Sequence, residues 1–211
     1  MRKNVFFYFL PVLFLISCIK HEIIPAPTKS VGLRSSFVGV IDGTDIKWLQ
    51  NVDDYTCTPS QDKLLTSSDG KQNSAIYKSK ISSVSSSGEI SVSLGSIYWI
   101  KTNDAFATKK LFNDFFDAFK TAPPTYSVGG KQGFEVRYKD NLGTEWVSDS
   151  ASIYPQNVTI TNISYDSDIN TDYCLFTLTF NCHLYHLNPV TKNNDFLEVK
   201  NAVFKGWFTR Q

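Results

Sequence analysis

An alternation of apolar and polar side chains, sustained through most of residues 173–187, constrains the fold of this chain more than any other feature. Side chains at every second position share one face of a strand, whereas a helix repeats every 3.6 residues. One face holds Cys174, Phe176, Leu178, Phe180, Cys182, Leu184 and His186, and the other holds Thr177, Thr179, Asn181 and His183. The segment is therefore predicted to be one long strand with a buried face, which requires a sheet around it.

Further segments with the same period predict an all-β fold. Strands are expected within 37–41, 44–48, 74–84, 89–100, 133–138, 144–148, 158–165 and 196–208. Asp42-Gly43 and the segment 140–143 predict hairpin turns, and Gly95 interrupts its strand as a bulge would. The polar stretch Asn51–Gln72 is expected to be a long loop. We expect a mainly antiparallel β-sandwich in a single domain, residues 36–211.

One segment, Lys101–Thr121, follows a helical period instead. Thr108 or Asp104 can cap its start, and the segment 122–124, Ala-Pro-Pro, ends it. We interpret it as one amphipathic helix packed on the sheet, whose aromatic side chains belong to the core; a membrane or partner face is the alternative. These side chains are Phe106, Phe112, Phe115, Phe116 and Phe119.

The first 18 residues have the layout of a bacterial export signal. Arg2 and Lys3 precede an apolar run, Val5–Ile16, that would rise only about 18 Å as a helix, against the roughly 30 Å core of a bilayer. Leu15-Ile16-Ser17-Cys18 resembles the lipobox of bacterial lipoproteins. The resemblance implies removal of a signal peptide, residues 1–17, and attachment of acyl chains to Cys18. An ordinary secreted protein with a cysteine near its cleavage site is the alternative.

The segment 18–35 contains charged residues and two prolines without a sustained period, so we expect a tether that holds the domain off the membrane. This places the protein in the bacterial cell envelope, anchored to the outer membrane, on the periplasmic face or the cell surface. Lys and Arg total 21 against 20 Asp and Glu, so the formal net charge is only +1. Nucleic acid is therefore not an expected partner.

The loop Asp166–Asp172 carries oxygen-bearing side chains at alternate positions, as calcium loops do. It departs from an EF-hand because Thr171 occupies the position of the tight-turn glycine and Thr177 the position of the bidentate glutamate. We interpret the loop as a hairpin turn rich in Asp and Asn, and leave calcium binding as the alternative.

Cysteine spacing does not predict a disulfide framework. Cys174 and Cys182 are eight residues apart on one strand, about 26 Å, whereas the Cα atoms of a disulfide lie roughly 4.4 to 6.8 Å apart. Either could pair with Cys57, but buried free thiols are the expectation. His183 falls on the opposite face from Cys182 and His186, which disfavours a zinc site. No metal and no cofactor are predicted.

The sequence carries no established catalytic motif. Glu135 and Glu145 lie on the two arms of one predicted hairpin, and facing carboxylates there would suit a glycosidase. Aromatic residues make up 14% of the chain, enough to consider a surface on which sugar rings stack. Core packing is the expected role of the four tryptophans, Trp48, Trp99, Trp146 and Trp207.

Several segments together resemble uncharacterised secreted lipoproteins of the Bacteroidetes type. These segments are Phe37–Gly43 with Trp48, the hairpin from Gly133 to Ser148, Phe180–Tyr185 and Asn201–Gly206. Those proteins commonly have Asn-Gly before the last strand, where this chain has Asn201-Ala202. The resemblance implies an envelope-exposed β-domain and names no ligand.

We therefore expect a lipid-anchored envelope protein with a non-enzymatic binding or structural role. A glycan-binding module of a polysaccharide uptake system is the first alternative, and a hydrolase is the second. Solvent-exposed Trp and Tyr side by side would favour the glycan module, whereas a cleft with two close carboxylates would favour the hydrolase. The expected partners are the membrane, through the anchor, and a glycan or an envelope protein.

Overall fold

The computed structural model describes residues 29–65, 72–100 and 105–210. The predicted signal peptide, Cys18 and the first part of the predicted tether lie outside these residues. Residues 29–35, the rest of that tether, lead into the domain without helix or strand. No helix within the described ranges is long and apolar enough to cross a membrane.

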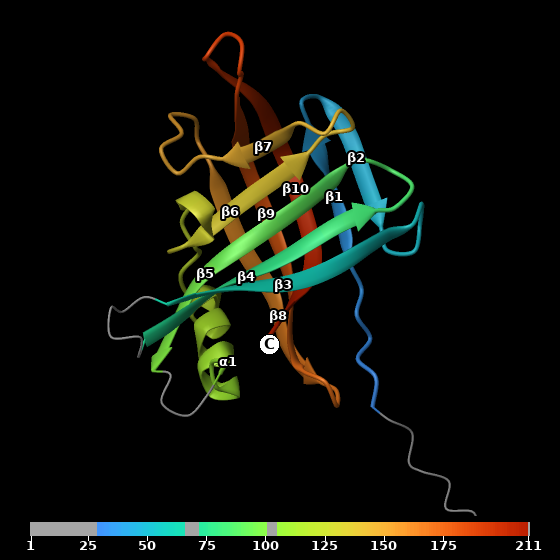
Figure 1. The fold of residues 1–211 in the computed structure, drawn as a ribbon. Coiled ribbons are helices and arrows are strands. Elements are labelled where there is room, and N and C mark those ends of the chain that lie inside the picture. The colour runs from blue at the N-terminus through green and yellow to red at the C-terminus, as the bar shows by residue number, and fades with distance from the viewer. Residues whose placement is uncertain (1–28, 66–71, 101–104, 211) are drawn as a thin grey trace, which may run out of the picture.

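The domain is built mainly from antiparallel strands, with one short α-helix (Figure 1). The helix α1, Lys109–Asp117, runs on into a 3₁₀ turn, Ala118–Lys120, and a second 3₁₀ turn spans Val128–Gly130. The strands are β1 (Ser36–Ile41), β2 (Thr44–Leu49), β3 (Tyr55–Leu65), β4 (Gln72–Ser83), β5 (Glu89–Ile100), β6 (Phe134–Lys139), β7 (Glu145–Ser148), β8 (Asn157–Ser167), β9 (Asp172–Leu187) and β10 (Asn194–Thr209).

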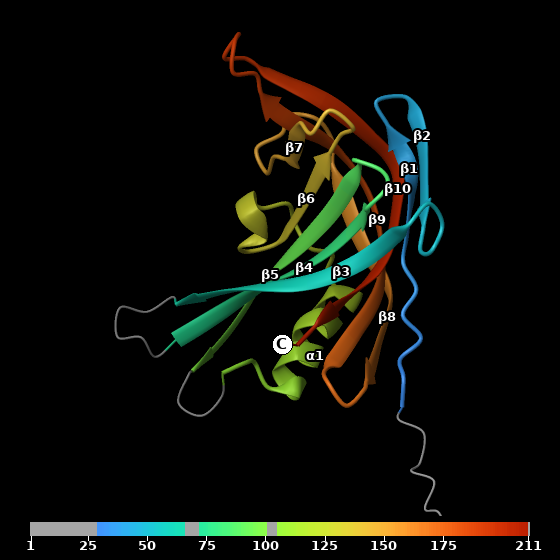
Figure 2. The same cartoon turned by 45° about the vertical axis from the view of Figure 1, so that its right-hand side comes forward.

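All ten strands belong to one sheet, in the order β2-β1-β10-β9-β7-β6-β5-β4-β3, with β8 also paired to β9. One edge of β9 is covered by β8 along its first half and by β7 near its end. The sheet curls strongly, so that β3 and β4 contact β10 across the interior (Figure 2). The predicted all-β fold with one helix is confirmed, and the two facing layers come from one continuous sheet.

The inside of the curl holds the hydrophobic core, and α1 covers one end of it (Figure 1). Phe112 and Phe116 are fully buried and lie edge-on to the Tyr77 ring, with ring centroids 5.2 and 5.5 Å away. The Thr108 hydroxyl caps the helix by accepting a hydrogen bond from the Leu111 N–H at 3.2 Å. The core role predicted for these aromatic residues is confirmed for both buried rings.

Phe106 is the exception among the five phenylalanines, because it is 37% exposed. The Lys63 ammonium lies 3.2 Å from the centre of its ring, so it takes part in a cation–π contact at the surface. Thr108, one of the two predicted caps, is the observed cap, and the helix begins at Lys109. Residues 101–104, including the alternative cap Asp104, lie outside the described residues.

The predicted hairpins are confirmed. Asp42 and Gly43 join β1 to β2 with φ values of 46° and 75°, the pair of positive values that a type I′ turn requires. Asp140–Gly143 joins β6 to β7. The bulge expected at Gly95 is also present, since Ile76 pairs with Gly95 while Ala75 pairs with Ile97.

The long loop predicted for Asn51–Gln72 is wrong, because Tyr55–Leu65 forms the edge strand β3. An edge strand pairs on one side only and leaves one face largely in water, so its sequence can be polar and still form a strand. Thr56, Thr58 and Ser60 are exposed. Pro59, which argues against a central strand, is tolerated at an edge.

Candidate functional site

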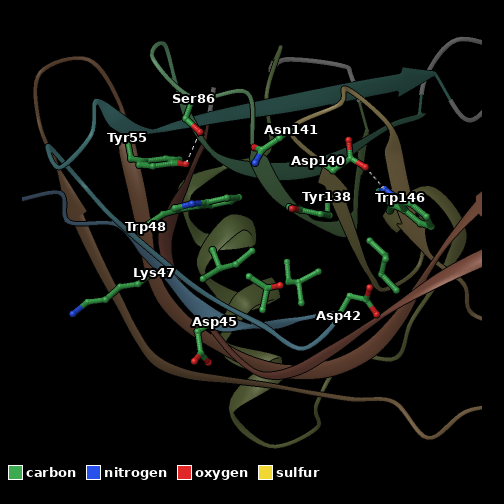
Figure 3. A pocket seen from close by; sticks show the side chains of 14 residues that line it. Asp42, Asp45, Lys47, Trp48, Tyr55, Ser86, Tyr138, Asp140, Asn141 and Trp146 are labelled. Carbon is green, nitrogen blue, oxygen red and sulfur yellow. Dashed lines mark hydrogen bonds between the residues drawn. The ribbon is translucent and has the colours of Figure 1, made fainter.

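A cleft of about 460 Å³ opens between the β1–β2 hairpin and the β6–β7 hairpin (Figure 3). Its aromatic lining comes from four strands: Trp48 on β2, Tyr55 on β3, Tyr138 on β6 and Trp146 on β7. The rest of the lining is mixed: it includes aliphatic side chains, the uncharged polar Ser86 and Asn141, and the charged Asp42, Asp45 and Lys47 (Figure 3). We call this site the Trp48 cleft.

Trp48 is the centre of the aromatic lining. Its ring lies 4.9 Å from the Tyr55 ring with an interplanar angle of 17°, and 6.3 Å from the Tyr138 ring at 25°. Phe37, its partner in the β1–β2 register, supports it from the core. The neighbouring turn approaches so closely that a Cβ on Gly88 would lie 2.9 Å from the indole. These contacts hold the indole in one orientation before any ligand arrives.

Asp140 fixes the opposite wall of the cleft. Its Oδ1 accepts hydrogen bonds from the backbone N–H groups of Leu142 and Thr144, both at 2.9 Å, and its Oδ2 accepts one from Trp146 Nε1 at 3.0 Å. Burial by itself would raise the pKa of this carboxyl, but the hydrogen bonds, led by the one from Trp146, hold the pKa below its usual value. Asp140 is therefore a charged structural group that orients Trp146.

Three uncharged polar groups at the cleft remain able to bond a ligand. The Tyr55 hydroxyl donates to Ser86 Oγ at 3.1 Å, which leaves further hydrogen-bonding capacity on both oxygens (Figure 3). The side-chain amide of Asn141 has no hydrogen-bond partner in the described part of the chain. The cleft therefore combines aromatic rings with an amide, hydroxyls and the charged side chains of Asp42, Asp45 and Lys47.

The paired carboxylates considered for a glycosidase are not arranged for that chemistry. Arg137 lies between them, with Nε 2.7 Å from Glu135 Oε1 and Nη1 2.7 Å from Glu145 Oε1. Glu135 is only 2% exposed and also accepts a hydrogen bond from the Gly129 N–H. A guanidinium therefore pairs with both carboxylates, and the facing pair considered as an alternative is not the arrangement observed.

Residues 168–171 form the turn between β8 and β9, while Asp166 and Asp172 lie in these strands, so the predicted hairpin turn is present. Asp168 Oδ1 accepts hydrogen bonds from the N–H groups of Asn170 (2.8 Å) and Thr171 (3.0 Å), and Oδ2 accepts one from the Tyr173 hydroxyl (2.8 Å). These are the bonds of a turn closed by an aspartate side chain. Within the described residues, no group of three or more His, Cys, Asp and Glu side chains is placed to hold a metal ion.

The register predicted for β9 is confirmed. Cys174 and Cys182 are both buried on the core face, and they and Cys57 are free thiols. Burial raises the pKa of Cys57 to about 11 and that of Cys182 to about 12. His183 lies on the opposite face, stacked under Tyr154 with ring centroids 4.1 Å apart. The disfavoured zinc cluster is therefore not formed.

The four tryptophans divide into two groups. Trp99 and Trp207 are 8% and 5% exposed and belong to the interior, as expected, whereas Trp48 and Trp146 line the cleft. Tyr55, Tyr138 and Asn141 were not expected at a site from their positions in the sequence. The inward orientation of Tyr138 could have been predicted, because it follows the buried Phe134 and Val136 at two-residue spacing near the end of β6.

No family model, no curated protein and no solved structure matches this chain.

Proposed function

We propose that this chain is a lipid-anchored protein of the bacterial envelope that binds a ligand without transforming it. The anchor rests on the basic start, the short apolar run and the lipobox-like Leu15-Ile16-Ser17-Cys18. The irregular segment Lys29–Ser35, which precedes β1, agrees with a tether between anchor and domain. Two or three acyl chains at about 0.8 kcal/mol per buried CH₂ hold a protein on a bilayer far longer than one chain does.

The Trp48 cleft supports the binding role. Its rings are fixed by neighbouring rings and by Asp140, and the carboxylate of Asp140 is occupied by three hydrogen bonds within the protein. A general acid or base has to reach the proton that it transfers, and Asp140 is instead used to position Trp146. The arrangement is that of a preformed binding surface.

A glycan is the ligand class that we propose for the cleft, and the meeting of four aromatic side chains in one lining carries this choice. Trp48 and Tyr55 stack face to face and Tyr55 is buried, so these two rings do not form an open platform of exposed side-by-side aromatics. Pyranose rings present C–H faces that pack on aromatic rings, while their hydroxyls need donors and acceptors at the edge. Ser86 and Asn141 supply such groups at the rim of this cleft. A volume of about 460 Å³ lies within the roughly 300 to 1,000 Å³ range of small-molecule sites.

The glycan proposal is tested by titrating neutral oligosaccharides while following tryptophan fluorescence and binding heat. We expect saturable binding to at least one glycan and a loss of about tenfold or more in affinity in Trp48→Ala and in Asn141→Ala, a loss of about 1.4 kcal/mol. Tyr98→Ala is the matched control, because Tyr98 is an exposed aromatic residue outside the cleft. Absence of binding across neutral glycans, or equal loss in the control, would contradict the proposal.

The anchor is tested separately with Cys18→Ser, because both lipidation and cleavage need that thiol. We expect the variant to leave the detergent phase or to persist with its leader attached, and its intact mass to lack the acyl chains. An unchanged membrane fraction and an unchanged mature mass would refute the anchor while leaving the glycan site untouched.

A further inference from the structure

A second cavity, of about 580 Å³, lies where the N-terminal segment joins the sheet. It is lined by the segment Leu33–Ser36, by Leu49–Asn51 after the end of β2, and by Lys205 of β10. Leu49 and Trp48 are adjacent on β2, so their side chains point to opposite faces of the strand. This cavity, which we call the Arg34 pocket, is therefore distinct from the Trp48 cleft.

The charges around the Arg34 pocket are of one sign. Arg34 and Lys205 both line it and are both exposed, and none of its described lining residues is acidic. Neither cation has an ion pair within the described ranges. Most lysines elsewhere in the domain do have a carboxylate partner, namely Lys29, Lys78, Lys80, Lys109, Lys110, Lys120 and Lys200.

The Gln50 amide of the pocket is oriented as a donor. Gln50 Oε1 accepts a hydrogen bond from the Ser35 N–H at 2.8 Å and another from the Ser35 hydroxyl at 3.5 Å. Because the carbonyl side of this amide is engaged, its NH₂ group is the side left for a ligand. The Gln50 N–H also donates to the Ser35 carbonyl at 3.1 Å, so both walls of the pocket are tied together.

Lys205 is held in register with these donors by the sheet. It pairs with Ser36 in the β1–β10 ladder, and Ser36 pairs with Leu49 in the β1–β2 ladder. The two ladders therefore bring Lys205, Ser36 and Leu49 into line on three neighbouring strands, and Gln50, which follows Leu49, lines the same cavity. A guanidinium, an ammonium and neutral donors without a competing carboxylate match the oxygens of a phosphate group.

We propose that the Arg34 pocket binds a phosphate group carried by a larger molecule. The cavity exceeds the volume of the phosphate alone, and its open side accepts the rest of the ligand. Two sources share this chemistry: the head group of an anionic lipid and a soluble phosphorylated solute. The lipid source rests on the proposed anchor at Cys18. Arg34 lies 16 residues after Cys18, so the chain between them spans at most about 58 Å and keeps the pocket within that distance of the anchored end.

The test uses the full chain purified in detergent and three probes measured by isothermal titration. The probes are inorganic phosphate, dihexanoyl phosphatidylglycerol and dihexanoyl phosphatidylcholine, the last of which carries a compensating positive charge. We expect saturable binding of phosphate or of phosphatidylglycerol that weakens as salt is raised, because exposed charges are screened. Tighter binding of phosphatidylglycerol than of phosphate identifies a lipid head group, and the reverse order identifies a soluble ligand.

Arg34→Gln and Lys205→Gln should each weaken binding by about tenfold, the effect of about 1.4 kcal/mol for one charge-assisted hydrogen bond. Lys131→Gln is the matched control, because Lys131 is an exposed lysine outside the pocket. The proposal is overturned if neither anion binds saturably, or if the control weakens binding as much as the two pocket variants. Glycan binding in the Trp48 cleft is unaffected by either result.

Discussion

The carboxylate of Asp172 offers the sharpest test of how the helix is attached to the sheet. Lys109 Nζ, Ser167 Oγ and Arg210 Nε each lie 2.6 Å from one of its oxygens. Lys109 begins α1, Ser167 ends β8, and Arg210 follows β10 and also donates to the Ala107 carbonyl at 3.1 Å. Asp172 therefore joins the start of the helix to two ends of the sheet.

The contribution of the Asp172 carboxylate to the free energy of unfolding can be worked out from the pKa of this carboxyl. Burial by itself would raise the pKa of Asp172, but hydrogen bonds from Lys109, Ser167 and Arg210 lower it from 3.8 to about 2. At about 1.36 kcal/mol per pKa unit the difference corresponds to about 2 kcal/mol. The Lys109 side chain is 54% exposed, and solvent screens that part of the interaction, so we expect about 1 to 2 kcal/mol.

The perturbation is Asp172→Asn, assayed by urea unfolding from pH 7 to pH 2. Because the folded pKa lies below the unfolded one, the stabilisation is complete above about pH 5 and is lost as the pH falls toward 2. The wild type should therefore exceed the variant by about 1 to 2 kcal/mol at pH 7, and the difference should shrink below about pH 4. Contributions of other titrating groups cancel in this comparison.

Asp114→Asn is the matched control. Asp114 pairs with Lys110 on the outer side of α1, where the two side chains are 55% and 84% exposed. Loss of this exposed ion pair should lower the free energy of unfolding by less than about 0.5 kcal/mol. Two results would refute the reasoning. The first is a difference in the free energy of unfolding between wild type and Asp172→Asn that stays constant down to pH 2. The second is a difference at pH 7 that is no larger for Asp172→Asn than for Asp114→Asn.

Three further outcomes are expected from the placement of β8 and β9. Phe180→Ala should destabilise the domain by about 3 to 5 kcal/mol in urea unfolding, whereas Thr179→Ala on the exposed face should stay within about 0.5 kcal/mol. Cys174 and Cys182 should react slowly with a water-soluble thiol reagent until the protein is denatured, and rapid labelling of the native protein would contradict their burial. Calcium should leave the melting temperature unchanged, because the Asp168 carboxylate already accepts hydrogen bonds at both oxygens; a rise that Asp168→Ala abolishes would show that an ion binds there.

Local features of the fold could be predicted because their causes lie within a few residues. The turn at Asp42-Gly43 needs two positive φ values, and this dipeptide adopts them readily. The helix follows from its apolar spacing and from the hydroxyl of Thr108. The strand β3 could not be predicted in the same way, because its polar composition and Pro59 become compatible with a strand only at an edge.

Periodicity and turn chemistry were enough to predict most strands, the hairpin turns, the helix and the buried face of β9. The cleft could not be predicted in this way, because its aromatic residues lie on four strands that meet through the curl of the sheet: Trp48, Tyr55, Tyr138 and Trp146. Trp99 and Trp207 are buried instead, although all four tryptophans lie on strands. Alternation fixes the face of a strand on which a side chain lies, whereas the curvature of the sheet determines what that face meets.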